Sequence, residues 1–140
     1  MIDSYNPLFY YPYEEEERNK DKVNNLYSPK EGLIKGNLFV NEYKGYKNYV
    51  QKGKNPSSEK EALMLDIMAY DHASHDLLLC IDVYPDKKDY ISLYEKYIDK
   101  LKELKEMYAK KFNPLCASEG KIRDGYFDYV TSPSPWLGVY

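Results

Sequence analysis

Residues 57–85, SSEKEALMLDIMAYDHASHDLLLCIDVYP, decide the fold of this chain of 140 residues. Ser58 followed three residues later by Glu61 is a capping box, which predicts the start of a helix. Pro85 predicts its end. Residues spaced alternately four and three apart form one packing seam on this helix: Leu63, Ile67, Tyr70, Ser74, Leu77 and Ile81.

Both flanks of this seam are also apolar, but they differ in size. One flank carries small side chains, namely Ala62, Ala69, Ala73 and Cys80. The other carries large ones, namely Met64, Met68, Leu78 and Leu79. Because one neighbouring helix covers only one stripe, we expect this helix to be contacted from more than one side.

The following stretch predicts a second helix that packs on the first. After the short loop IDVYPDK, Asp86 is placed to cap a helix whose apolar residues keep a coiled-coil spacing: Tyr90, Tyr94, Tyr97, Leu101, Leu104 and Tyr108. Most other positions are charged, and Phe112-Asn113-Pro114 ends the pattern. A short connection between two such seams predicts an antiparallel hairpin over residues 58–114.

The segment before the linker predicts a short helix. Ser28 as N-cap, Pro29 in the first turn and Glu31 at the third position form a capping box, and Gly36 is placed to end the helix. The apolar residues that follow, 38–40, must dock on another surface, because so short a segment cannot fold alone. The whole segment covers residues 27–50.

The remaining stretches predict little regular structure. Residues 1–26 combine prolines, tyrosines and an acidic run, which predicts an extended or disordered arm. Residues 51–57 have the composition of a linker. Residues 115–140 predict a docking tail whose aromatic side chains lie extended on a helical surface. The expected fold class is therefore mainly α: an antiparallel two-helix hairpin, one short N-terminal helix, and extended aromatic N- and C-terminal arms.

The composition favours interfaces over a dry core. Of the 43% hydrophobic residues, 17 are Tyr, whereas Phe contributes 4 and Trp 1. A tyrosine hydroxyl needs a hydrogen-bond partner or water, so tyrosines favour half-buried positions. Amphipathic packing is one explanation of the excess; oxidative cross-linking of exposed tyrosines in an insoluble assembly is the alternative.

Several classes of protein do not fit this sequence. A net charge of −3 without a basic cluster argues against binding of nucleic acid. Charged and polar residues interrupt the longest apolar run, so no membrane span is expected. The N-terminal acidic run is unlike a secretory signal. Two cysteines without a CxxC pair indicate unpaired thiols in a reducing compartment.

One cluster has side chains capable of chemistry: Asp71, His72, His75 and Asp76. Asp71 and His75 are four residues apart and share the face of Met64 and Met68. Because the chain has only 2 histidines, further metal ligands would have to come from other segments. We therefore expect polar contacts here, with no catalytic residue, no metal and no cofactor. A small metal-binding or redox accessory using Asp71 and His75 is the alternative.

Two stretches resemble known families. Residues 63–115 together with the end SPSPW resemble the small bacterial spore coat polypeptides called CotJB. The matching positions are His75, Asp76, Leu77, Leu79, Asp82, Pro85, Tyr94, Tyr97, Pro114, Pro133, Pro135 and Trp136. Residues 27–46 resemble the companion polypeptide CotJA. Its matching positions are Tyr27, Ser28, Pro29, Leu33, Gly36, Leu38, Phe39 and Tyr43. The chain thus resembles a CotJA–CotJB fusion.

The resemblance implies a non-enzymatic structural component of the endospore inner coat, made in the mother cell. The implied partners are a manganese-catalase-like coat protein of the CotJC type, which would hold the metal, and other coat proteins. The expected partner-binding residues are Met64, Met68, Asp71, His75, Leu78, Leu79, Asp82, Phe39, Tyr43 and Trp136. A homo-oligomer that pairs through the Met/Leu face is the alternative.

Overall fold

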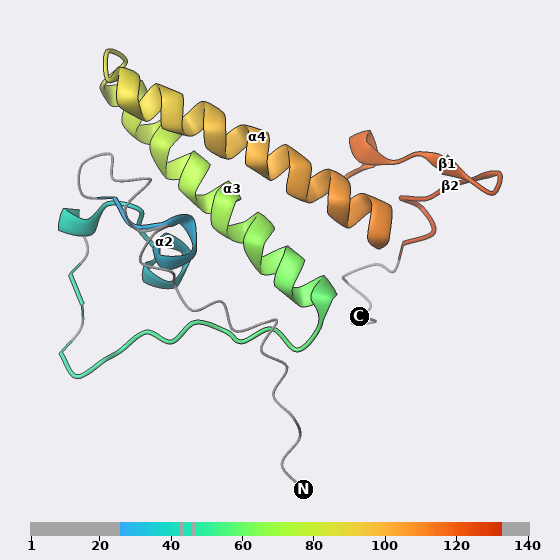
Figure 1. Cartoon of the computed structure of the whole chain (residues 1–140), viewed down its shortest axis with the longest axis horizontal. Coiled ribbons are helices and arrows are strands. Elements are labelled where there is room, and N and C mark those ends of the chain that lie inside the picture. The colour runs from blue at the N-terminus through green and yellow to red at the C-terminus, as the bar shows by residue number, and fades with distance from the viewer. Residues whose placement is uncertain (1–25, 43, 46, 133–140) are drawn as a thin grey trace, which may run out of the picture. The chain divides into compact units, whose positions relative to one another are not determined.

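The computed structural model describes residues 26–42, 44–45 and 47–132. Two long helices, α3 (Glu59–Val83) and α4 (Lys88–Lys111), pack as an antiparallel hairpin, and α2 (Pro29–Lys35) lies beside α3 (Figure 1). Two short 3₁₀ helices (Val40–Glu42 and Ala117–Glu119) and one pair of strands, β1 (Ile122–Arg123) and β2 (Tyr126–Phe127), complete the described part of the chain. The prediction of a mainly α fold built on a hairpin with one short N-terminal helix is confirmed.

The chain divides into two compact units, Met1–Leu101 and Lys102–Tyr140. The first contains α2, α3 and most of α4. The second contains the last turns of α4 and the strand pair. The predicted arm 1–26 lies outside the described residues except for Leu26, as do residues 133–140 of the predicted tail.

The start of α3 is fixed by two serines rather than one. The hydroxyl of Ser58 accepts a hydrogen bond from the backbone N–H of Glu61 at 3.2 Å, as the capping box predicts. The Glu61 carboxylate instead accepts hydrogen bonds from the N–H and the hydroxyl of Ser57, both at 2.7 Å. The paired Lys54 ammonium and these two Ser57 donors lower the pKa of Glu61 to about 2.

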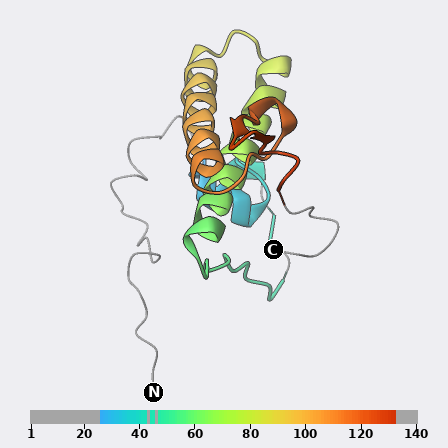
Figure 2. The same ribbon diagram turned by 90° about the vertical axis from the view of Figure 1, so that its right-hand side faces the viewer.

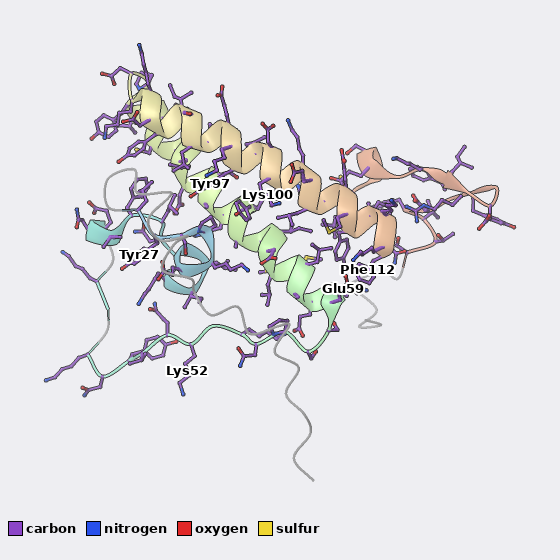
Figure 3. The ribbon with its side chains drawn as sticks, viewed as in Figure 1. Tyr27, Lys52, Glu59, Tyr97, Lys100 and Phe112 are labelled. Atoms are coloured by element: carbon purple, nitrogen blue, oxygen red, sulfur yellow. The ribbon has the colours of Figure 1, made fainter. Side chains whose placement is uncertain are left out.

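The core of the first unit lies where α3, α4 and the segment after α2 meet. Its buried residues are Leu38, Ala73, Leu77, Leu93 and Tyr97. Tyr97, labelled in Figure 3, is 1% exposed, and its ring meets that of Tyr70 edge-on at 5.5 Å. At the closed end of the hairpin, the Lys87 ammonium lies over the rings of Tyr84 and Tyr90, at 4.3 and 4.9 Å from their centres.

The predicted seams are correct in part. On α3, four of the six seam residues are buried, namely Leu63, Ile67, Ser74 and Leu77, whereas Tyr70 and Ile81 are half-buried. On α4, Leu93 is buried although the spacing did not predict it, and Tyr90 and Tyr94 are half-buried. The centre of burial on α3 shifts toward Ala69 and Ala73, both fully buried, because small side chains let the segment around α2 approach closely.

The short helix α2 has the predicted capping. The Ser28 hydroxyl accepts from the Glu31 N–H at 3.3 Å, and the Glu31 carboxylate accepts from the Ser28 N–H at 3.4 Å. Gly36 ends the helix in the left-handed region at φ +73°, and its N–H donates to the Gly32 carbonyl at 2.7 Å. Both ends of α2 are therefore satisfied within the segment itself.

The second unit contains a strand pair that was not predicted. Asp124 (φ +48°) and Gly125 (φ +81°) form the turn, and Ile122 pairs with Phe127 across it. Asp128, 8% exposed, accepts from the Lys121 N–H at 2.7 Å and pairs with the Arg123 guanidinium at 2.9 Å. Arg123 also donates to the Ala109 carbonyl in the last turns of α4 at 2.8 Å. The Arg123 guanidinium, held by the buried Asp128 carboxylate, thus connects the strand pair to the last turns of α4.

Candidate partner-binding surface

Two neighbours within the first unit cover α3 on two of its sides. One side packs on α4 through Leu77, Leu93 and Tyr97. The other side, the flank of small residues, receives the segment around α2, as both views of the ribbon show (Figures 1 and 2). The expectation that α3 is contacted from more than one side is therefore confirmed.

Two polar contacts hold the segment around α2 in place. The Asp76 carboxylate accepts a hydrogen bond from the backbone N–H of Leu38 at 2.9 Å, and the Leu38 side chain is fully buried. The Lys30 ammonium pairs with the Asp66 carboxylate at 2.9 Å. Asp66 and Asp76 lie ten residues apart on α3, so they hold the two ends of the segment on one face of the helix.

Within the described part of the chain, the third side of α3 stays largely exposed. We call it the open face and define it by the seven residues Met64, Met68, Asp71, His75, Leu78, Leu79 and Asp82. At ~100° per residue they fall within a sector of about 100° around the helix axis. Met68 is 47% exposed, Leu78 39% and Leu79 53%; Asp71, His75 and Asp82 are exposed, and Met64 is half-buried.

Apolar and polar groups are arranged in lines along the open face. Asp71, His75 and Asp82 run along its middle, Leu78 lies on one edge, and Met68 and Leu79 lie on the other. Val83 and Tyr84, 67% and 50% exposed, continue the apolar edge beyond the residues predicted from the sequence. Such a face can bury aliphatic groups at its edges and accept charge-assisted hydrogen bonds from a basic partner group between them.

The three other predicted contact residues do not lie on the open face. Phe39 is half-buried on the core of its own chain, with its ring centre 6.2 Å from that of Tyr90. Tyr43 and Trp136 lie outside the described residues. A role for these three in partner binding stays a prediction.

The four polar residues expected to form one cluster on α3 lie on two different sides of the helix. Asp76 belongs to the contact with Leu38, and the Nε2 atom of His72 lies 3.9 Å from the same carboxylate oxygen. Asp71 and His75 project from the open face. Within residues 26–42, 44–45 and 47–132, no group of three or more His, Cys, Asp or Glu side chains could hold a metal ion. No helix in the described part is long and apolar enough to cross a membrane.

Sequence reasoning did not identify the contacts that Asp66 and Asp76 make with the segment around α2. No local pattern marks Leu38 as the donor, because the two residues are 38 positions apart. The strand pair, by contrast, had a local signal that was overlooked: the dipeptide Asp124-Gly125 is typical of a two-residue hairpin turn.

Comparison with known proteins places the hairpin and the tail in one family. The family model described as "CotJB protein" matches residues 61–137, which is more than half of the chain. No curated protein and no solved structure matches the chain. The matched range includes α3 from Glu61 onward, α4, the strand pair and all seven residues of the open face.

Proposed function

The chain belongs to the CotJB family of spore coat proteins, and from this premise we propose that it binds a manganese-catalase-like coat protein and helps to assemble it into the coat. In this proposal the protein is a non-enzymatic component of the inner coat and is synthesised in the mother cell. The partner is of the CotJC type and supplies the metal chemistry. Contacts with other coat proteins then connect the pair to the rest of the coat.

The open face of α3 is the observation that carries this proposal. Folding of the first unit covers two sides of the helix and leaves Met68, Leu78 and Leu79 exposed. Large aliphatic groups on one helix face, grouped around carboxylates, are typical of a surface that packs against a partner helix. A catalase-like partner that is a helical bundle offers such helices on its surface.

We further propose that residues 27–50 are a CotJA-like segment fused to the CotJB-like part. The resemblance through Ser28, Pro29, Gly36 and Leu38 is its basis, and the segment lies outside the family match at 61–137. The contacts of Lys30 and Leu38 with α3 support the proposal, since two companion polypeptides that act together gain from being held together. Fusion makes that contact intramolecular.

Co-expression with a manganese-catalase-like coat protein tests the partner. We expect the two proteins to co-elute in size exclusion, and we expect Met68→Asp with Leu79→Asp to weaken the complex by about tenfold or more, because each new carboxylate would be buried in the interface without a partner. Met107→Asp is the matched control, since Met107 on α4 is exposed to a similar extent, 44% against 47% for Met68. Equal weakening by both variants would show that the open face is not the binding surface.

The same experiment separates the alternatives. Separate elution of the two wild-type proteins at micromolar concentration would reject the catalase-like partner. A homo-oligomer that Leu79→Asp dissociates would show that a second copy covers the open face. Stoichiometric Mn, Fe or Zn in the purified chain, lost in Asp71→Ala, would instead favour the metal-binding accessory.

A further inference from the structure

We propose that the segment 26–42 exchanges between copies of this protein, so that the segment of one chain docks on α3 of another. We call residues 26–42 the docking segment, and we call the α3 surface around Asp66, Ala69, Ala73 and Asp76 the segment site. The exchanged contact would link copies side by side without using the open face. It is therefore independent of the proposed catalase-like partner.

Noncovalent contacts alone hold the docking segment on its site. It consists of the buried Leu38 side chain, the hydrogen bond from Leu38 N–H to Asp76 at 2.9 Å, and the ion pair between Lys30 and Asp66 at 2.9 Å. Each of these groups meets the same partner whether the segment comes from the same chain or from another.

The docking segment also carries within itself the groups that cap and close it, wherever it docks. The ends of α2 are satisfied by Ser28, Glu31, Gly32 and Gly36, all inside the segment. The N–H of Tyr27 donates to the carbonyl of Leu38 at 2.8 Å, which closes the segment on itself. The same element can therefore form on the site of its own chain or on that of another chain, with the same internal hydrogen bonds.

The linker is long enough for exchange. Twenty residue steps separate Leu38 from Ser58, and such a stretch reaches about 66 Å when extended. The path along α3 from Ser58 to Asp76 is only about 27 Å. Figure 3 shows the linker running through Lys52 toward Glu59. Except for Gln51 and Pro56, the described linker residues from Lys47 to Ser58 are exposed.

The balance between the closed and the exchanged form depends on concentration. In a dilute solution the tether keeps the segment on its own chain, because the effective concentration across such a linker is of millimolar order. In a packed protein layer the concentration of neighbouring sites approaches that value. Exchange then becomes competitive without any new contact.

Mixing two full-length variants tests the proposal. Leu38→Asp disables the docking segment, and the double substitution Asp66→Lys with Asp76→Lys disables the segment site. Neither variant can close on itself, but the intact segment of the second can dock on the intact site of the first. We expect a 1:1 heterodimer by light scattering after size exclusion only in the mixture, with each variant monomeric alone. A mixture that stays monomeric while both variants keep wild-type helicity would overturn the proposal.

A second variant keeps both surfaces intact. Deletion of residues 43–57 leaves five residue steps between Leu38 and Ser58, which reach about 17 Å. The path to Asp76 along α3 is about 27 Å, and the Asp76 side chain with its hydrogen bond shortens it by only about 7 Å. The segment therefore cannot close on its own chain, whereas docking on another chain needs no linker. We expect this variant to be a dimer or a larger assembly that Leu38→Asp dissociates. A monomer would overturn the proposal.

Discussion

Asp76 and Asp71 lie five residues apart on α3, and the same substitution should affect them differently. Asp76→Ala removes the acceptor of the Leu38 N–H and should lower the free energy of unfolding by about 1–3 kcal/mol, because a part-buried donor is left without its partner. Asp71 is exposed, so Asp71→Ala should change it by less than about 0.5 kcal/mol. Urea unfolding followed by circular dichroism measures both.

The conservative substitution sharpens this comparison. Asp76→Asn keeps an amide oxygen in place of the carboxylate and should recover part of the loss. If Asp76→Ala and Asp71→Ala are equally stable, the hydrogen bond to Leu38 contributes nothing to holding the docking segment.

Tyr108 should make the protein sensitive to alkali. Its side chain is 5% exposed, and burial raises its pKa above the usual value near 10. As the pH rises, the Tyr108 hydroxyl therefore loses its proton at a lower pH in the unfolded chain than in the folded one. Its contribution to the stability of the fold is complete below pH ~10 and is lost as the pH rises toward the folded pKa. Tyr108→Phe should flatten the decrease in stability between about pH 9 and pH 11. Urea unfolding across this range measures the slope.

Tyr126 is the matched control for that experiment, since it is 70% exposed. Tyr126→Phe should leave the slope as in the wild type. An equal flattening by both substitutions would show that the alkaline loss does not come from the buried hydroxyl of Tyr108.

At the scale of elements, the turn of the strand pair depends on Gly125. This residue has φ +81°, a conformation that costs an L-residue about 1–2 kcal/mol. Gly125→Ala should therefore open the pair of strands and speed hydrogen exchange of the Asp128 N–H, which donates to the Lys121 carbonyl at 3.0 Å. Lys121→Ala, on an exposed side chain, is the control and should leave that exchange rate unchanged. Unchanged exchange in Gly125→Ala would contradict the turn.

The elements with local signals were predictable from the sequence. The caps of α2 follow from Ser28, Glu31 and Gly36, because each acts on neighbours within a few residues. The hairpin follows from two apolar repeats and a short loop. The exact face of burial on α3 did not follow, since Ala69 and Ala73 become core positions only when another segment packs on them. Small residues allow such an approach but do not reveal what makes it.

The candidate site was predictable to a similar degree. The large-residue flank of α3 was identified from its spacing, and its residues Met68, Leu78 and Leu79 are exposed. The partner-binding residues expected from the sequence lie on this flank, but the position of the docking segment on the opposite, small-residue flank was not predictable. That position is set by Asp66 and Asp76, whose partners are distant in sequence.

At the scale of the whole molecule, three sides of α3 have three different surroundings. One side serves the hairpin, one receives the docking segment, and one is left open. The first two sides determine whether the protein folds. The third side does not. Substitutions on the open face should therefore weaken assembly, whereas substitutions on the first two sides should weaken stability.

This division of α3 has a consequence for how the protein changes over generations. Substitutions at buried positions such as Ala73 and Leu77 change the packing within the chain itself, so compensating changes should arise within the same gene. In the proposed complex, substitutions at Met68 or Leu79 change the packing against the partner, so their compensations should arise in the partner's gene. One helix can thus record two separate evolutionary histories, one on its buried faces and one on its open face.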